Sequence, residues 1–233
     1  MTGTLYMVPT PLGEEAIAYL PPAVTDVLHR VEHYIVEDEK QARRFLRKIG
    51  MKRDFATLHM SVLNEHTPPM EWLTMLAPLS AGHDIALISD AGCPGVADPG
   101  SEVVRIAHEK NIRVVPLPGP SSIIQALMAG GLNGQQFTFC GYLPRERAER
   151  IRKLKEMEQV ALSKNISQVF MDTPYRTQQV WADMMDQLKD DTMVCLALGI
   201  NTTSEFIRTW PVKRWKKQQP PSGKIPCMFI IGK

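Results

Sequence analysis

The first half of the chain alternates short apolar runs with longer segments whose apolar residues recur at helical spacing. The runs are "LYMV" (5–8), "YIV" (34–36), "IALIS" (85–89) and "IRVVPL" (112–117), and the helical segments include 16–29 and 102–110. Short continuous apolar runs are typical of strands that are covered on both faces. Strand, helix and strand in succession predict right-handed crossovers and a largely parallel sheet.

A proline-rich segment, "PLPGPSS" (116–122), interrupts this alternation. Three prolines in seven residues are typical of a connection between elements and are incompatible with a helix interior. We therefore predict a domain boundary here, with an N-terminal α/β domain over residues 1–118 and a C-terminal α/β domain over residues 119–233.

The second half of the chain predicts a mixed sheet. A helix begins at Ser121 or Ser122, whose hydroxyl groups suit an N-cap, and ends near Gly130. The segments that follow are a strand over 137–143, a charged helix over 145–163, a strand over 167–172, a helix over 178–188, and apolar strands over 193–200, 205–212 and 227–233. The last three strands have little helix between them, which favours antiparallel pairing. The predicted fold class is α/β, with a mostly parallel N-terminal sheet and a mixed C-terminal sheet.

Composition fits a globular chain of one to two domains. Of the 233 residues, 44% are hydrophobic and 22% are charged, which argues against disorder and against a coiled coil. The N-terminus has no secretory pattern, and no window approaches the ~18 apolar residues of a membrane span. We expect a cytoplasmic protein that does not enter a membrane.

Neither the four cysteines nor the six histidines show the spacing of metal ligands. Cys93, Cys140, Cys195 and Cys227 are spread along the chain, and the histidines do not combine with carboxylates at helical spacing. We expect reduced, buried thiols and no metal. Nothing near Cys93 in the sequence lowers the pKa of its thiol, so we expect a small turn residue there and no nucleophile.

The formal net charge of +2 hides three basic segments, at 40–53, 145–155 and 213–217. Such segments bind RNA phosphates with an affinity that falls steeply with salt, and they are also typical of solvated helix faces. For residues 213–217 we favour a solvated loop. The RNA-contact candidates are Arg43, Arg44, Arg47, Lys48, Arg145, Arg147, Arg150, Arg152 and Lys153, with Tyr142 and Tyr175 available to stack on a base.

The segment "LISDAGCPGVADPG" (87–100) follows a predicted buried strand with an unusually restricted turn. Three glycines, two prolines and two aspartates exceed what a change of chain direction requires. Neither GxxxxGK[ST] nor a GxGxxG after the first strand is present, so phosphate binding is not indicated. Asp90 stands at the carboxyl end of a strand, where open α/β sheets bind ligands. Together these features favour a ligand with cationic character and no phosphate.

Five segments in order resemble the tetrapyrrole methylase superfamily of S-adenosylmethionine-dependent methyltransferases. They are "LYMVPTPLGE" (5–14), "VED" (36–38), "ALISDAGCPGVADPG" (86–100), "RVVPLPGPSS" (113–122) and "ALMAGGLNGQQFTFCGYLPR" (126–145). Within the superfamily the pattern is similar to that of the ribosomal RNA small subunit methyltransferase I group, which 2′-O-methylates a cytidine. The resemblance implies a homodimer of two-domain subunits, with S-adenosylmethionine bound in a cleft between the domains.

The resemblance also implies which residues hold the cofactor. They are Pro11 in the first turn, Asp90, Ala91, Gly92 and Cys93 around its methionine end, Ser121 and Ser122 after the proline-glycine turn, Met171 beside the adenosine, and Ala197, Leu198 and Pro226 around the adenine. S-adenosylmethionine carries a sulfonium and an ammonium against one carboxylate and has no phosphate. Its chemistry therefore agrees with the ligand that the 87–100 turn favours.

Three segments depart from the RNA-modifying group. Its usual "PxGNLxDxT" is replaced by "PLGEEAIAYLPPAV" (11–24), and its "SPHR" becomes "TPYR" (173–176). Its "ARELTKxxEE" is replaced by "ALGINTTSEFI" (197–207), which is more similar to the corrin and porphyrin branch. The basic segments favour a ribosomal RNA substrate, while these departures favour a tetrapyrrole precursor that is methylated on carbon.

The catalytic base stays unassigned. A ribose hydroxyl needs a general base or a strong orienting contact, whereas an electron-rich pyrrole carbon needs less help. Glu37, Asp38 and Asp90 lie at strand ends, but none has a partner in the sequence that fixes its role. A cofactor-binding module without turnover is therefore a third hypothesis beside the two methyltransferases.

Overall fold

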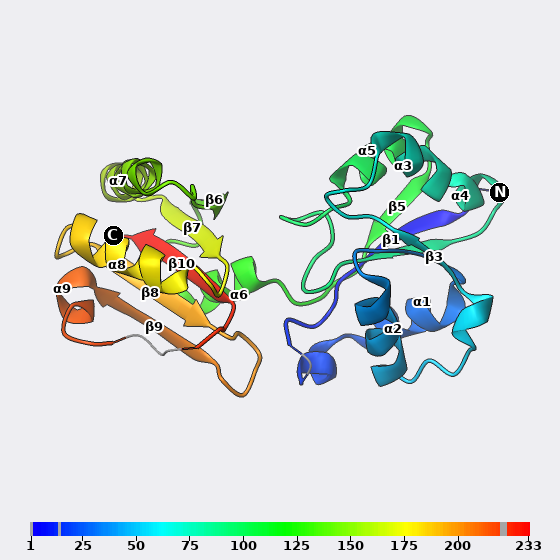
Figure 1. The fold of residues 1–233 in the computed structure, drawn as a ribbon, viewed down its shortest axis with the longest axis horizontal. Helices are drawn as coiled ribbons and strands as arrows, with labels where there is room; N and C mark the ends of the chain where they lie inside the picture. Colours follow the sequence, from blue (N-terminus) through cyan, green and yellow to red (C-terminus); the bar gives the residue numbers. More distant parts are fainter. Residues whose placement is uncertain (1, 14, 220–222) are drawn as a thin grey trace. The chain divides into compact units, whose positions relative to one another are not determined.

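The computed structural model describes residues 2–13, 15–219 and 223–233. The chain divides into two compact units, unit 1 (Met1–Ser121) and unit 2 (Ser122–Lys233), each with its own sheet and helices (Figure 1). The division falls between the last strand of unit 1 and the first helix of unit 2, in the same loop as the predicted boundary after residue 118.

The core of unit 1 is a five-stranded sheet in the order β3-β2-β4-β1-β5, in which every neighbouring pair is parallel. Its strands are β1 (Thr4–Val8), β2 (His33–Val36), β3 (His59–Val62), β4 (Ile85–Ile88) and β5 (Arg113–Pro116). Val8 and Val36 both lie in register with Ile88, from opposite sides of β4. The loops that leave these three central strands therefore begin at the same end of the sheet, the carboxyl end of its strands.

Helices cover both faces of this sheet (Figure 1). One face carries α1 (Pro22–Arg30) and α2 (Glu39–Lys48), which pack on alternate strand residues such as Val8, Tyr34 and Ile88. The other face carries α3 (Pro69–Met75), α4 (Ala77–Ser80) and α5 (Ser101–Glu109), which pack on Leu5, Ile35 and Leu87. Burial from both sides explains why β4 is apolar at every position.

The neighbouring strands β1 and β4 are the switch point of this topology. The chain leaves β1 through α1 on one face, and it leaves β4 through α5 on the other. Connections that depart to opposite faces leave a crevice between them at the carboxyl ends of the two strands. Ligand binding in unit 1 is therefore expected at the residues that follow Val8 and Ile88.

The four predicted strands of unit 1 and the helix over 102–110 are confirmed within one or two residues at their ends. Strand β3 was missed because it is a half-exposed edge strand, "HMSV", without the apolar run of a central strand. The single helix predicted over 16–29 is wrong. It is a short 3-10 helix, η1 (Ala16–Tyr19), followed by α1, because consecutive prolines at 21 and 22 hold the intervening chain extended.

Unit 2 is built on a mixed five-stranded sheet in the order β6-β7-β10-β8-β9. Its strands are β6 (Phe137–Tyr142), β7 (Ser167–Asp172), β8 (Met193–Leu198), β9 (Phe206–Pro211) and β10 (Cys227–Gly232). Strand β6 is parallel to β7, and the three remaining pairs are antiparallel. The predicted antiparallel pairing of the last three strands is confirmed.

One face of the unit 2 sheet is covered by α7 (Arg147–Lys164), α8 (Thr177–Gln187) and α9 (Val212–Trp215), around a core that includes Phe170, Phe229 and Trp215. The other face is covered by α6 (Ser122–Gly130), where a side chain at Gly130 would meet Ile230 and Cys195. The predicted helix after the proline-rich segment is confirmed, including its end at Gly130.

These observations confirm the predicted fold class of two α/β parts, with a parallel sheet first and a mixed sheet second. Within the described residues, no helix has both the length and the apolar character that crossing a membrane requires.

Candidate functional site

The loops after β1 and β4 are joined by a small antiparallel bridge. Thr10 N donates to Gly92 O at 2.9 Å, and Gly92 N donates back to Thr10 O at 3.1 Å. The Thr10 hydroxyl also donates to the carbonyl oxygen of Ser89 at 3.0 Å. Gly92 has a φ of +82°, and a Cβ there would lie 3.3 Å from Leu12, so glycine is the residue that fits this position.

A third segment, residues 117–120, closes against the same place. Leu117 N donates to Met7 O at 2.9 Å, and the thiol of Cys93 donates to Pro120 O at 3.4 Å. A Cβ on Gly119 would stand 2.2 Å from Cγ of Pro9, so only glycine lets these two turns touch. The crowded 87–100 turn thus has a structural role, because it holds three loops together at the switch point.

Carboxylates gather beside this turn. Asp90 N donates to Oε2 of Glu37 at 3.4 Å, which brings the loop after β4 to the end of β2. Burial, together with the charges of Glu37 and Asp38, raises the pKa of Asp90 to about 6. Burial likewise raises the pKa of Asp98 to about 6, with contributions from Glu37 and Asp90. Groups that repel one another in this way favour a cationic ligand.

Among the residues that the structure describes, no three His, Cys, Asp or Glu side chains are arranged to hold a metal ion. Asp38 is the N-cap of α2, where its side chain accepts a hydrogen bond from Gln41 N at 2.8 Å. Burial and the charge of Asp98 raise the pKa of the Cys93 thiol, so this cysteine does not have the properties of a nucleophile.

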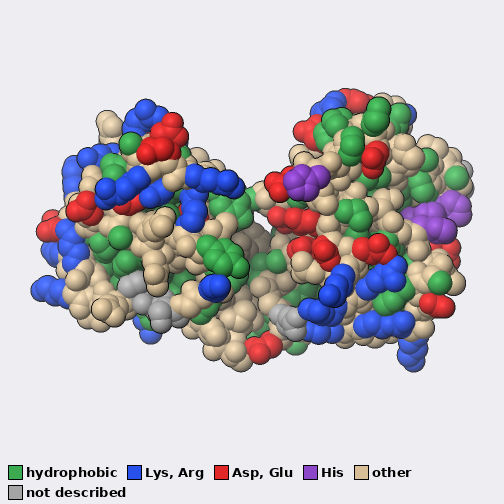
Figure 2. Space-filling view, viewed as in Figure 1, with side chains coloured by type: hydrophobic (Ala, Val, Ile, Leu, Met, Phe, Trp, Pro, Cys, Tyr) green, Lys and Arg blue, Asp and Glu red, His purple; other side chains and the backbone are tan. Residues whose placement is uncertain are grey.

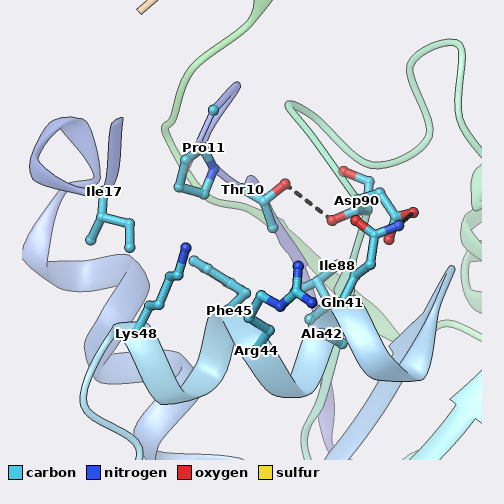
Figure 3. A pocket seen from close by; sticks show the side chains of 12 residues that line it. Thr10, Pro11, Ile17, Gln41, Ala42, Arg44, Phe45, Lys48, Ile88 and Asp90 are labelled. Carbon is cyan, nitrogen blue, oxygen red and sulfur yellow. Dashed lines mark hydrogen bonds between the residues drawn. The ribbon is translucent and has the colours of Figure 1, made fainter. Parts of the chain in front are cut away.

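Asp90 also borders a pocket of about 100 Å³ on the side of unit 1 that carries α2 (Figure 3). Figure 3 shows Pro11 and Ile17 on one side of it and Phe45, Arg44 and Lys48 of α2 on the other. The amide Nε2 of Gln41 donates to Oδ2 of Asp90 at 2.8 Å and links α2 to the turn after β4. The pocket therefore combines apolar walls, two cations and one carboxylate.

The structure sorts the basic residues of α2 into two groups. Arg43 pairs with Glu39, and its guanidinium lies over the Phe55 ring at 5.6 Å. Arg47 lies over the same ring at 4.3 Å and donates to Met51 O at 2.9 Å. Arg44 and Lys48 line the pocket. The four cations that the sequence predicted to form one ridge therefore lie on two faces of the helix. Only the face with Arg44 and Lys48 borders the pocket.

The expected cofactor residues of unit 2 lie at one end of its sheet. Met228 of β10 is in register with Met171 of β7 on one side and with Ala197 of β8 on the other. Leu198 is in register with Cys227, and Pro226 O accepts from Gly199 N at 3.0 Å. Met171 is half-buried, whereas Ala197 and Leu198 are buried in β8, which pairs with β10 on one side and with β9 on the other.

The sequence-predicted site residues therefore form two groups. Unit 1 brings Pro11, Asp90, Ala91, Gly92 and Cys93 together around the Thr10–Gly92 bridge. Ser121 ends unit 1, and Ser122 begins α6 of unit 2. Met171, Ala197, Leu198 and Pro226 make up the second group.

Two predictions about basic segments are wrong. Arg150 of α7 is not available to RNA, because its side chain is only 5% exposed and pairs with Asp183 at 2.8 Å. Arg147 also bonds to Asp183, at 2.9 Å. The four basic residues of 213–217 are exposed to solvent as predicted, but the segment is not a loop, because residues 213–215 belong to α9 (Val212–Trp215), whose Trp215 is buried and donates to Val194 O.

Three residues that shape the site were missed by sequence reasoning. Gln41 and Phe45 lie on α2, for which the sequence indicates only a cluster of basic residues. No local pattern indicates that these two side chains line a pocket with Asp90. Asp98 was quoted within the long motif but was not singled out. Its signal is the aspartate of "ADPG" (97–100), at a turn that also needs Gly100 at a φ of +132°.

Comparisons with known proteins find relatives along nearly the whole chain. Ribosomal RNA small subunit methyltransferase I of Pseudomonas aeruginosa is 34% identical over 232 residues, which cover 98% of this chain and 78% of that protein. The protein of the same name from Escherichia coli O157:H7 is 33% identical over 232 residues, with coverages of 98% and 77%.

Two solved structures share the fold. The crystal structure of the methyltransferase CobJ superposes with a TM-score of 0.67 at 15% identity, covering 100% of this chain and 95% of that one. The uroporphyrin-III-C-methyltransferase from Thermus thermophilus superposes with a TM-score of 0.57 at 18% identity, covering 100% and 93%. The family model of the Tetrapyrrole (Corrin/Porphyrin) Methylases matches residues 4–213. The chain belongs to this family and is a methyltransferase.

Proposed function

We propose that this protein transfers the methyl group of S-adenosylmethionine to a ribose 2′ hydroxyl of ribosomal RNA. The observation that carries the choice of RNA is the similarity over 98% of the chain to proteins named ribosomal RNA small subunit methyltransferase I. Similarity to the two tetrapyrrole methyltransferases supports the fold alone, because their identities to this chain are 15% and 18%.

The residues at the switch point of unit 1 fit S-adenosylmethionine. Asp90, Asp98 and Glu37 provide negative charge for a sulfonium and an ammonium. The backbone from Asp90 to Cys93 lies at the carboxyl end of β4, and the glycine at 92 lets this turn pack closely against Leu12 and Pro120. We propose that these residues and Pro11 hold the methionine end, and that Met171, Ala197, Leu198 and Pro226 hold the adenosine.

The bound cofactor would supply a methyl group on a sulfonium, which is already a good leaving group. The protein then has to hold the acceptor oxygen in line with the methyl carbon, at about 3 Å, and to exclude water. It also has to accept the hydroxyl proton. The carboxyls of Asp90 and Asp98 have pKa values of about 6, so either one is mostly ionised and able to take a proton at neutral pH.

The test is methyl transfer to defined RNA. Purified protein would be incubated with methyl-labelled S-adenosylmethionine and small ribosomal subunits that lack the modification, and the label in extracted RNA would be counted. A 2′-O-methyl group blocks alkaline cleavage at its own nucleotide, so label in an alkali-stable dinucleotide identifies the acceptor atom. The Asp90→Ala variant is the negative control.

Label in alkali-stable dinucleotides from the wild-type reaction alone is the expected result. Label on a base would reject the ribose while keeping RNA as the substrate. Label absent from RNA but transferred to uroporphyrinogen or a corrin precursor would reject RNA.

We further propose that the protein acts in the cytoplasm as a homodimer, as the resemblance to its family implies. Light scattering at micromolar concentration tests the dimer directly. A mass of about 52 kDa is expected, twice the 26.2 kDa of the chain. A single-chain mass would remove the dimer from the proposal and leave the reaction untouched.

A further inference from the structure

The pocket between η1 and α2 is lined by an aromatic ring and two cations, which the binding of a cationic cofactor does not require. Its walls include Ile17, Ala42, Phe45 and Ile88, and its cations are Arg44 and Lys48. Figure 3 shows the Arg44 and Lys48 side chains reaching along the pocket on either side of Phe45. Two cations beside an aromatic ring suit an anionic ligand that also has a flat face.

The lining of the pocket indicates what it can hold. The pocket has a volume of about 100 Å³ and combines one aromatic ring with two cations. A single planar ring with a phosphate at the rim matches this lining.

A hydrogen bond orients the polar side chains at the end of the pocket beside the turn after β4. Asp90 accepts at Oδ2 from Nε2 of Gln41, so the amide oxygen of Gln41 points away from the carboxylate. That oxygen is an acceptor for a ring N–H or an exocyclic amine. On its other side, Asp90 leads into the 90–93 turn that is proposed to hold the cofactor. A group seated in the pocket would thus lie next to the turn that is proposed to hold the cofactor.

We infer that this pocket receives the acceptor nucleotide of single-stranded RNA, with its base against Phe45, its flanking phosphates on Arg44 and Lys48, and its ribose beside Asp90. The inference rests on the proposed function and deepens it by assigning the substrate subsite. It makes Phe45 and Gln41 specificity residues, and it leaves Arg43 and Arg47 outside the site.

The first experiment compares two double variants of one helix. Arg44→Ala/Lys48→Ala removes the pocket cations, whereas Arg43→Ala/Arg47→Ala removes the same charge at the same spacing from the face that contacts Phe55. Binding of a single-stranded oligonucleotide is measured over a range of salt concentrations. Each lost phosphate contact makes the slope of log K against log[salt] less steep by about 0.7.

The expected result is a slope less steep by about 1.4 and an RNA affinity at least tenfold weaker in the pocket variant, with less than threefold weakening in the control. Both variants should bind S-adenosylmethionine within twofold of the wild type, which shows that unit 1 is folded. Equal RNA affinities and salt slopes in the two double variants would overturn the inference.

A second pair of variants tests the ring. Phe45→Leu keeps an apolar wall and removes the stacking face, and Phe55→Leu makes the same change outside the pocket, at the ring beneath Arg43 and Arg47. Stacking on an aromatic side chain contributes about 1–3 kcal/mol per base, so roughly tenfold weaker RNA binding is expected for Phe45→Leu alone.

Titration with cytidine 5′-monophosphate separates this inference from the proposed function, because it needs no methyl transfer. Amide NMR shifts should concentrate on residues 41–48 and 10–13 of the wild type and should vanish in Arg44→Ala/Lys48→Ala. Shifts elsewhere, or none at millimolar nucleotide, would overturn the pocket assignment even if RNA is methylated. Shifts in the pocket without RNA methylation would keep the nucleotide site and reject the reaction.

Discussion

The side-chain amide of Gln41 donates a 2.8 Å hydrogen bond to Oδ2 of Asp90, across 49 residues of sequence. This contact ties the first turn of α2 to the turn after β4. Asp90 is therefore the point where the proposed cofactor turn and the proposed nucleotide pocket meet. Its carboxylate is held close to Glu37, and this proximity has measurable consequences for stability and for the pH dependence of the reaction.

Replacing Asp90 with Asn should stabilise the fold at alkaline pH. The folded-state pKa of about 6 lies above the ordinary value of 3.8, so the ionised carboxyl destabilises the protein above pH 6. Asp90 keeps contact with solvent, so we expect a gain of only about 1 kcal/mol in the free energy of unfolding at pH 8. The gain should shrink as pH falls from 6 to 4. Urea unfolding at several pH values measures it, and a gain independent of pH would contradict the assignment.

Glu37→Gln should move the acidic limb of the pH–rate profile. If a carboxyl of the Asp90 and Asp98 pair accepts the proton, kcat/KM falls as pH drops through about 6. The charge of Glu37 raises the pKa of both groups, so its removal shifts the limb to lower pH. Glu39→Gln is the matched control, because Glu39 pairs with Arg43. An unmoved limb in Glu37→Gln would exclude both carboxyls as the base.

Gly119→Ala should lower the free energy of unfolding of unit 1, because it disrupts the loops at the carboxyl ends of the strands. The added methyl would stand 2.2 Å from Cγ of Pro9, and a proline ring has no rotamer that moves aside. The two turns must separate, at a cost of about 1–3 kcal/mol. Gly134→Ala is the control, since nothing lies within 4 Å of a Cβ there. Equal stability of the two variants in urea unfolding would show that the turns are not in contact.

Asp183→Ala should destabilise unit 2 by about 3–5 kcal/mol, because it leaves Arg150 buried without its counter-charge. Asp186→Ala removes an exposed carboxylate from the same helix and should change stability by less than about 0.5 kcal/mol. Tryptophan fluorescence during unfolding reports the difference, since Trp181, Trp210 and Trp215 all lie in unit 2. A loss under 1 kcal/mol in Asp183→Ala would show that Arg150 reaches solvent.

The burial of Arg150 shows that a count of charges does not predict which basic residues are exposed. Counting charges made 145–155 a candidate RNA-binding ridge. Helical spacing contains a contrary signal, because Arg150 shares the apolar face of α7 with Leu154, Met157 and Ala161. The partner that neutralises it, Asp183, is 33 residues away and has no local signature.

Local patterns did predict most strands and the turn that matters most. The apolar run of β4 can be recognised in the sequence because the strand is buried from both faces. The glycines after it can be recognised because each has a positive φ that other residues rarely adopt. The pocket could not be predicted in the same way. It depends on α2 packing beside β4, which brings Gln41 to Asp90 and turns Arg44 and Lys48 to one side of the helix and Arg43 and Arg47 to another.

Calorimetric titration of S-adenosylmethionine tests the central claim most directly. The wild type and Asp26→Ala, which loses an exposed carboxylate on α1, should bind with a micromolar Kd, equivalent to about −8 kcal/mol. Asp90→Ala should bind at least tenfold more weakly while keeping its circular dichroism spectrum. Absence of binding to the folded wild type, or equal affinity in Asp90→Ala, would contradict the assignment of the turn after β4 as the cofactor site.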